Sequence, residues 1–232
     1  MKQIYLVVLL FFVAFGLVTI VVSGAHPALA ADDPELGPCL EAIFSEIAPG
    51  ELSAEEEAGI LYMREEEKLA RDVYNRLGEL WGIPIFSNIA RSEETHMDAM
   101  LVLIDRYGLS DPVDDDTPGV FEDPALQSLY DELTASGSVS LTYAFRVGAL
   151  IEELDIADLK DHLEMTDNDD VRIVYQNLMR GSRNHLRSFY RQLNRSGVDY
   201  KPTYLSMDEF SRIITSPRET GGAIDDPNYR FE

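Results

Sequence analysis

Apolar side chains recur at intervals of three and four residues along most of this chain, which is the spacing that places them on one face of an α-helix. Four long segments have this period and begin or end at residues typical of helix boundaries. We predict long helices at residues 54–80, 87–108, 140–165 and 170–196. Strand signals are sparse, so the pattern predicts an all-α protein.

The segments between these helices predict how they are connected. Gly82 and Pro84 interrupt the chain between the first two helices, with Ser87 as the cap of the second, and residues 167–169 form a turn between the last two. Short turns make consecutive helices antiparallel neighbours, so we expect two antiparallel hairpins. Residues 109–139 are long enough for a crossover with a small helix inside it. Two hairpins with one long crossover are the topology of a ferritin-like four-helix bundle.

The N-terminus has the pattern of an export signal. An uncharged apolar run from Ile4 to Val22 follows Lys2, and Ala28-Leu29-Ala30 offers a small-x-small cleavage site. We therefore expect a mature protein that begins at Ala31, although the run is also long enough to remain as a membrane anchor. In both cases the folded part lies outside the cytoplasm, in the cell envelope or the extracellular space.

The domain organisation follows from these boundaries. We predict a signal or anchor at residues 1–30, a linker with a short helix at 31–52, the bundle at 53–197, and a C-terminal extension at 198–232. The extension is expected to hold one short helix followed by a mobile tail.

Charge and cysteine content exclude several functions. The chain has 42 acidic and 19 basic residues and a formal net charge of −23, which disfavours nucleic acid as a partner. Cys39 is the only cysteine, so an internal disulfide and a four-cysteine metal centre are both excluded.

Candidate chemistry begins with Glu93 and His96, which lie nearly one turn apart on the second long helix. Both interrupt an otherwise apolar stripe that should face the interior. A buried carboxylate and imidazole are costly unless something pairs with them. A cation held between helices is one such partner, and a hydrogen-bonded polar core is another.

The other long helices place similar groups on their inward stripes. The first has Glu67, although its neighbour Glu66 lies on an overlapping stripe and periodicity does not separate the two. The remaining inward groups are on the third and fourth helices, whereas His162 lies off the inward face and is expected to be exposed. The predicted metal ligands are Glu67, Glu93, His96, Glu152, Asp155 and His185. Oxygen and nitrogen ligands in this ratio favour iron or manganese, with zinc as a further option.

Three sequence phrases resemble known proteins. Glu67-x-x-Ala70-Arg71-x-x-Tyr74, Glu93-x-x-His96 and Glu152-x-x-Asp155 are similar to the helices of rubrerythrin-type ferritin-like proteins, and this resemblance selects Glu67 over Glu66. The phrases from Leu61 to Asp72, Gly148 to Asp155 and Gly181 to Arg187 resemble an uncharacterised ferritin-like family, domain of unknown function 2202, over roughly residues 50–195. That resemblance implies the bundle but hardly any activity.

One departure from the rubrerythrin pattern concerns the fourth helix, where Ser182 stands in place of a carboxylate. Asp155 restores the number of acids, but a mononuclear or asymmetric centre becomes plausible. Rubrerythrins also carry a cysteine-bound iron domain, which a single cysteine cannot build.

Three functional hypotheses remain open from the sequence. The first is an exported protein with a non-haem dinuclear centre, most simply of two iron ions, that oxidises ferrous iron or reduces oxygen or peroxide. The second is a metal-binding or surface-interaction module without turnover, and the third is a bundle with a polar core. The expected partners are metal ions and a small oxidant, the membrane only through an uncleaved N-terminus, and a homodimer is left open.

Overall fold

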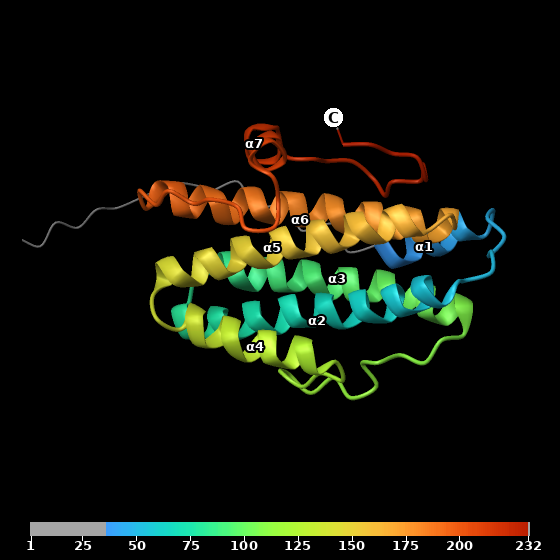
Figure 1. Cartoon of the computed structure of the whole chain (residues 1–232), viewed down its shortest axis with the longest axis horizontal. Helices are drawn as coiled ribbons and strands as arrows, with labels where there is room; N and C mark the ends of the chain where they lie inside the picture. The colour runs from blue at the N-terminus through green and yellow to red at the C-terminus, as the bar shows by residue number, and fades with distance from the viewer. Residues whose placement is uncertain (1–35, 232) are drawn as a thin grey trace, which may run out of the picture.

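The computed structural model describes residues 36–231, in which seven α-helices and no strand occur (Figure 1). The prediction of an all-α protein is confirmed. The predicted signal or anchor at residues 1–30 lies outside the described residues. The four long helices are α2 (Ala54–Trp81), α3 (Pro84–Tyr107), α5 (Leu141–Met165) and α6 (Asp169–Arg195), and the short ones are α1 (Leu36–Phe44), α4 (Pro124–Gly137) and α7 (Met207–Thr215).

The long helices lie in two layers, with α2 beside α3 and α5 beside α6 (Figure 1). Gly82 ends α2 with a φ of 64°, a left-handed conformation that glycine adopts without steric cost. The chain then turns back at once, since α3 begins at Pro84. The expected cap at Ser87 is wrong, because proline is itself favoured at the first helical position, and Ser87 lies in the first turn with its hydroxyl donating to the Pro84 carbonyl.

Side-chain caps fix four of the other helix starts. Ser53 and Glu56 form a reciprocal capping box at the start of α2, with Ser53 N donating to Glu56 Oε2 at 2.8 Å. Asp123, Ser140 and Ser206 accept hydrogen bonds from the first turns of α4, α5 and α7. The first short helix begins at Leu36, within the predicted linker segment, and its buried face against α3 starts with that leucine.

Helix α2 is buried on all sides over residues 63–74, although most of that segment is charged. The crossover after α3 covers its outer face. Glu65 accepts hydrogen bonds from two crossover amides, and Arg64 pairs with Asp111 at 2.9 Å. Lys68 donates to the carbonyls of two further crossover residues and pairs with Asp72 at 2.7 Å. The charged side chains on the outer face of α2 are therefore held in place by the crossover and do not form a solvated surface.

The C-terminal extension lies along the outer side of α6 (Figure 1). Glu219 forms ion pairs with Arg183 and Arg187, and Asn177 exchanges hydrogen bonds with the backbone of Ile224. The expectation of a mobile tail is therefore wrong for the described part of this segment. Hydrophobic periodicity does not reveal such an attachment, because it is polar.

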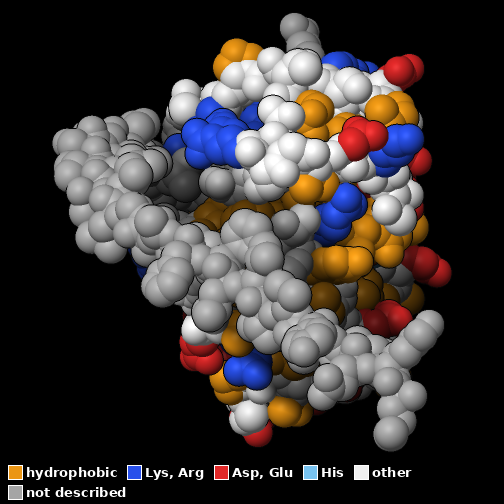
Figure 2. All heavy atoms as spheres, turned by 90° about the vertical axis from the view of Figure 1, so that its left-hand side faces the viewer, with side chains coloured by type: hydrophobic (Ala, Val, Ile, Leu, Met, Phe, Trp, Pro, Cys, Tyr) orange, Lys and Arg blue, Asp and Glu red, His pale blue; other side chains and the backbone are white. Residues whose placement is uncertain are grey.

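The apolar core is divided into two clusters along the bundle. Met63 and Leu178 belong to one cluster, and Tyr74 and Leu186 belong to the other. The polar inward residues of α2 and α6 lie between them. Among residues 36–231, no helix is both long and apolar enough to cross a membrane. At one end of the bundle, acidic, basic and hydrophobic side chains are intermixed where the surface is coloured (Figure 2).

Candidate metal centre

All six predicted ligands point into the bundle between the two apolar clusters. They come from all four long helices: one from α2, two from α3, two from α5 and one from α6. Every one of these side chains is at most 5% exposed, so none belongs to a solvated surface. Their relative exposures are Glu67 2%, Glu93 2%, His96 2%, Glu152 2%, Asp155 5% and His185 4%.

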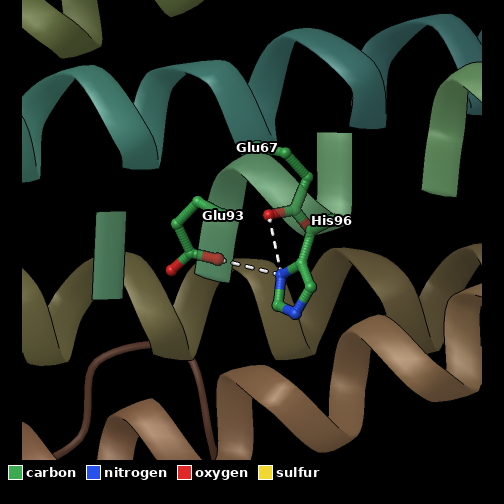
Figure 3. A group of neighbouring side chains, drawn as sticks. All are labelled: Glu67, Glu93 and His96. Atoms are coloured by element: carbon green, nitrogen blue, oxygen red, sulfur yellow. Dashed lines mark hydrogen bonds and ion pairs between the residues drawn. The ribbon is translucent and has the colours of Figure 1, made fainter. Parts of the chain in front are cut away.

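The first group of ligand atoms joins α2 to α3. His96 Nδ1 lies 2.9 Å from Glu93 Oε2 and 3.2 Å from Glu67 Oε2 (Figure 3). One potential ligand atom from each of these residues falls within 4.8 Å of the others. Two carboxylate oxygens and an imidazole nitrogen at this spacing suit one small cation.

The second group joins α3 to α5 and α6. His185 Nδ1 lies 3.1 Å from Glu93 Oε1 and 3.3 Å from Glu152 Oε2, and these three residues also bring ligand atoms within 4.8 Å of one another. Glu93 is common to both groups, with one oxygen near each histidine. A carboxylate in that position is suited to bridge two ions.

The two imidazoles are held in different ways. Ser92 Oγ lies 2.9 Å from His185 Nε2, and a ring N–H that donates to this hydroxyl leaves the Nδ1 lone pair directed at Glu93 and Glu152. His96 instead packs its Nε2 edge against the backbone of α6 at Gly181. Both histidines thus present Nδ1 to the carboxylates.

Asp155 belongs to neither of these groups. Ser182 Oγ donates a hydrogen bond to its Oδ2, while Oδ1 has no hydrogen-bond donor among the described residues. Five of the six predicted ligands therefore come together, and Asp155 lies to one side, next to Ser182. The carboxylate that the fourth helix lacks at position 182 is thus supplied nearby from α5.

Tyr74 has a role beyond core packing. Its hydroxyl donates to Glu152 Oε1 at 2.5 Å, and its ring packs against those of Phe86 and Phe189. The sequence places Tyr74 on the inward stripe but does not show this bond. Ser92 was also missed, although it lies one turn before His96 and its polar side chain on the inward side was the available signal. His162 is half-buried beside Tyr62 and Tyr175, so the expectation that it is exposed is wrong.

Burial and mutual repulsion make this a centre that retains protons when no cation is bound. Burial and the nearby charge of Glu93 raise the pKa of Glu152 to about 8. Burial likewise raises the pKa values of Glu67 and Asp155, partly offset at Glu67 by His96. The pKa of Glu93 is lowered to about 2, because contacts with the two histidines outweigh its desolvation.

The buried groups of the centre do not fully satisfy one another by hydrogen bonds, and a bound cation would satisfy them better. Glu67 Oε1 and Asp155 Oδ1 are buried without a hydrogen-bond donor among the described residues, and an orphaned buried carboxylate oxygen is costly. The pKa of His96 is raised well above its usual range, since Glu67 and Glu93 outweigh the effect of burial. Four carboxylates with two imidazoles favour hard or borderline divalent ions.

Gly181 offers a test of this arrangement. A Cβ at Gly181 would lie 2.3 Å from Nε2 of His96, so Gly181→Ala must displace that imidazole. Alanine normally stabilises a helix interior; here we expect a net loss of about 1–3 kcal/mol in the free energy of unfolding, measured by urea denaturation, together with weaker metal binding. The control is Gly37→Ala, whose Cβ meets no atom within 4 Å. A Gly181→Ala protein with unchanged stability and metal affinity would contradict the placement of His96.

The chain is similar to a protein family, to an uncharacterized protein and to a solved structure. The model of a family described as an uncharacterized protein domain, DUF2202, matches residues 56–217, a range that contains all six predicted ligands. The uncharacterized protein MJ0754 of Methanocaldococcus jannaschii is 51% identical over 170 residues, which cover 73% of this chain and 92% of the relative. A crystal structure of hypothetical protein MJ0754 from Methanococcus jannaschii is similar with a TM-score of 0.74 and 49% identity, over 75% of this chain and 99% of the other. This chain therefore belongs to the DUF2202 family.

Proposed function

We propose that this protein is an exported, ferritin-like four-helix protein with a dinuclear non-haem iron centre that oxidises ferrous iron or reduces oxygen or peroxide. The observation that carries the proposal is the position of Glu93 between two carboxylate–imidazole groups. Ferritin-like carboxylate proteins combine a Glu from each of two helices with Glu-x-x-His motifs from the other two. Here Glu67 and Glu152 supply the single acids and Glu93-x-x-His96 one motif, while Ser182 and Asp155 replace the acid of the second.

The chain's own residues have definite tasks in this proposal. Glu67 and His96 would hold one ion, Glu152 and His185 the other, and Glu93 both. Bound iron supplies the electron-transfer and oxygen-binding chemistry. Glu152, whose pKa is raised to about 8, releases a proton as a cation arrives. Tyr74 holds Glu152 through one oxygen and leaves the other directed at His185.

The surroundings of the centre keep water away from the proposed reaction. The apolar clusters on either side of it exclude solvent, and the ligands are almost completely buried. A dry, enclosed site strengthens electrostatic interactions and limits side reactions.

Ferrous loading tests the catalytic part of the proposal. Protein loaded with ferrous iron without oxygen, and then mixed with oxygen, should develop a ferric absorbance faster than protein-free buffer and saturate at a fixed iron-to-protein ratio. His96→Ala should abolish the saturable phase, whereas the matched change His162→Ala should retain it.

A second candidate function is metal binding without turnover, which the hydroxyl of Ser182 in place of a carboxylate favours. The same measurement separates the two. Stoichiometric binding of iron with oxidation no faster than in buffer would leave a binding module and reject the enzyme.

A further inference from the structure

Glu66 is a second inward acid of α2 that the centre does not use. Its side chain is 2% exposed, and neither carboxylate oxygen has a hydrogen-bond donor among the described residues. The charged groups that most affect it are all acids, namely Asp155, Asp158 and Glu67. A carboxylate buried among carboxylates needs either a proton or a cation as its partner.

These acids lie on the neighbouring helices α2 and α5, and Asp158 is the least buried of them. Asp158 on α5 is half-buried and lies within hydrogen-bonding reach of Glu66. Burial and the charge of Asp155 raise the pKa of Glu66, and burial and the charge of Glu67 raise the pKa of Asp155, so electrostatic repulsion links these acids to the centre. Each of these interactions joins α2 to α5, two helices that pack directly on each other.

Because the centre is buried, acids beside it can help a metal ion to reach it. No ligand of the centre is more than 5% exposed, so an ion must pass through the protein to reach it. A divalent ion gives up its water shell reluctantly and does so most easily where carboxylate oxygens replace the waters one by one.

On this basis we propose that Glu66, Asp155 and Asp158 form an auxiliary site for a divalent cation with a preference for oxygen ligands, on the route by which metal enters the centre. Its ligand atoms are less convergent than those of the centre, since only the two groups around Glu93 bring three of them within 4.8 Å among the described residues. The auxiliary ion would therefore keep part of its water shell and bind more weakly than the ions of the centre. The inference rests on the proposed function, because the route needs a metal centre as its end point.

Equilibrium dialysis of the full chain against Mn²⁺ tests the auxiliary site. The wild type should bind tightly at the centre and take up one further equivalent at higher concentration. Glu66→Gln, which keeps the size of the side chain, should lose that further equivalent and retain the others. Asp158→Asn should do the same, and it remains informative if the buried substitution prevents folding. The matched control is Asp161→Asn, an exposed acid on the same helix, which should bind as the wild type does.

The outcomes separate this inference from the proposed function. If both variants bind as much Mn²⁺ as the wild type, Glu66 and Asp158 share a proton and the auxiliary site is rejected while the centre stands. If Glu66→Gln loses every equivalent, Glu66 belongs to the centre itself and the auxiliary site is again rejected. A wild type that binds no Mn²⁺ and no Fe²⁺ would overturn the centre, and the entry route with it.

Discussion

Removal of bound metal by a chelator is expected to lower the melting temperature of the wild-type protein by about 5–10 °C. A ligand at one hundred times its dissociation constant stabilises the native state by about 2.7 kcal/mol when the unfolded chain does not bind it. For a chain of this size, each kcal/mol corresponds to roughly 2–4 °C. The cation would relieve the repulsion among the buried carboxylates around Glu93, which is the physical source of the gain.

The variant His96→Ala should lose most of that metal-dependent difference, because it removes the nitrogen that lies 2.9 Å from Glu93 and 3.2 Å from Glu67. The control His162→Ala removes a half-buried imidazole outside the centre. It lowers the absolute melting temperature through lost packing but should keep the difference between metal-loaded and chelated protein. Equal differences in the wild type and in His96→Ala would mean that these residues form a hydrogen-bonded polar core without a metal.

The second large effect expected is a loss of stability of the metal-free protein as the pH rises from 5 to 8. The pKa of Glu152 is raised to about 8, so the folded state keeps a proton that the unfolded state releases above pH ~4.5. A folded state that binds more protons is destabilised as the pH rises, by on the order of 4 kcal/mol for Glu152 across this window. The raised pKa values of Glu67, Asp155 and His96 act in the same direction.

Glu93 acts in the opposite direction in acid. Since its pKa is lowered to about 2, its contribution is present above pH ~4.5 and is lost as the pH falls toward 2. Urea denaturation of chelated protein at several pH values measures both limbs. Glu152→Gln should flatten the limb between pH 5 and 8, and bound metal should do so in the wild type because it replaces the protons. A metal-free midpoint that increases from pH 5 to 8 would contradict the cluster's electrostatics.

The sequence predicts the long helices well because apolar spacing and capping residues are local signals. Ser53 and Ser140 cap α2 and α5 within one residue of the predicted starts, whereas the start of α3 was misplaced because Pro84 outcompetes Ser87. Where two neighbouring residues can each start a helix, the sequence alone does not show which one does, because the tertiary structure decides.

The candidate centre was predictable to the extent that its residues interrupt apolar stripes. Glu93, His96 and His185 stand out in this way, and the structure brings them together with Glu67 and Glu152. The supporting contacts were not predictable, because the partners of residues such as Tyr74 and Gly181 lie on other helices. Periodicity also fails for Glu66, which is buried although it is offset from the main stripe of α2.

The enclosed part of α2 has a consequence for how this segment tolerates change. A typical surface helix has a solvated face on which neutral substitutions accumulate, but residues 63–74 have none. One side faces the centre, and the other binds the crossover through Arg64, Glu65 and Lys68. A substitution such as Lys68→Arg keeps the charge but changes the length and shape of the side chain. On a solvated helix face it would alter only a hydrated side chain, whereas here it alters the buried ion pair with Asp72. Mutational freedom in this helix is thus confined to its ends, and its most polar segment is also its least replaceable.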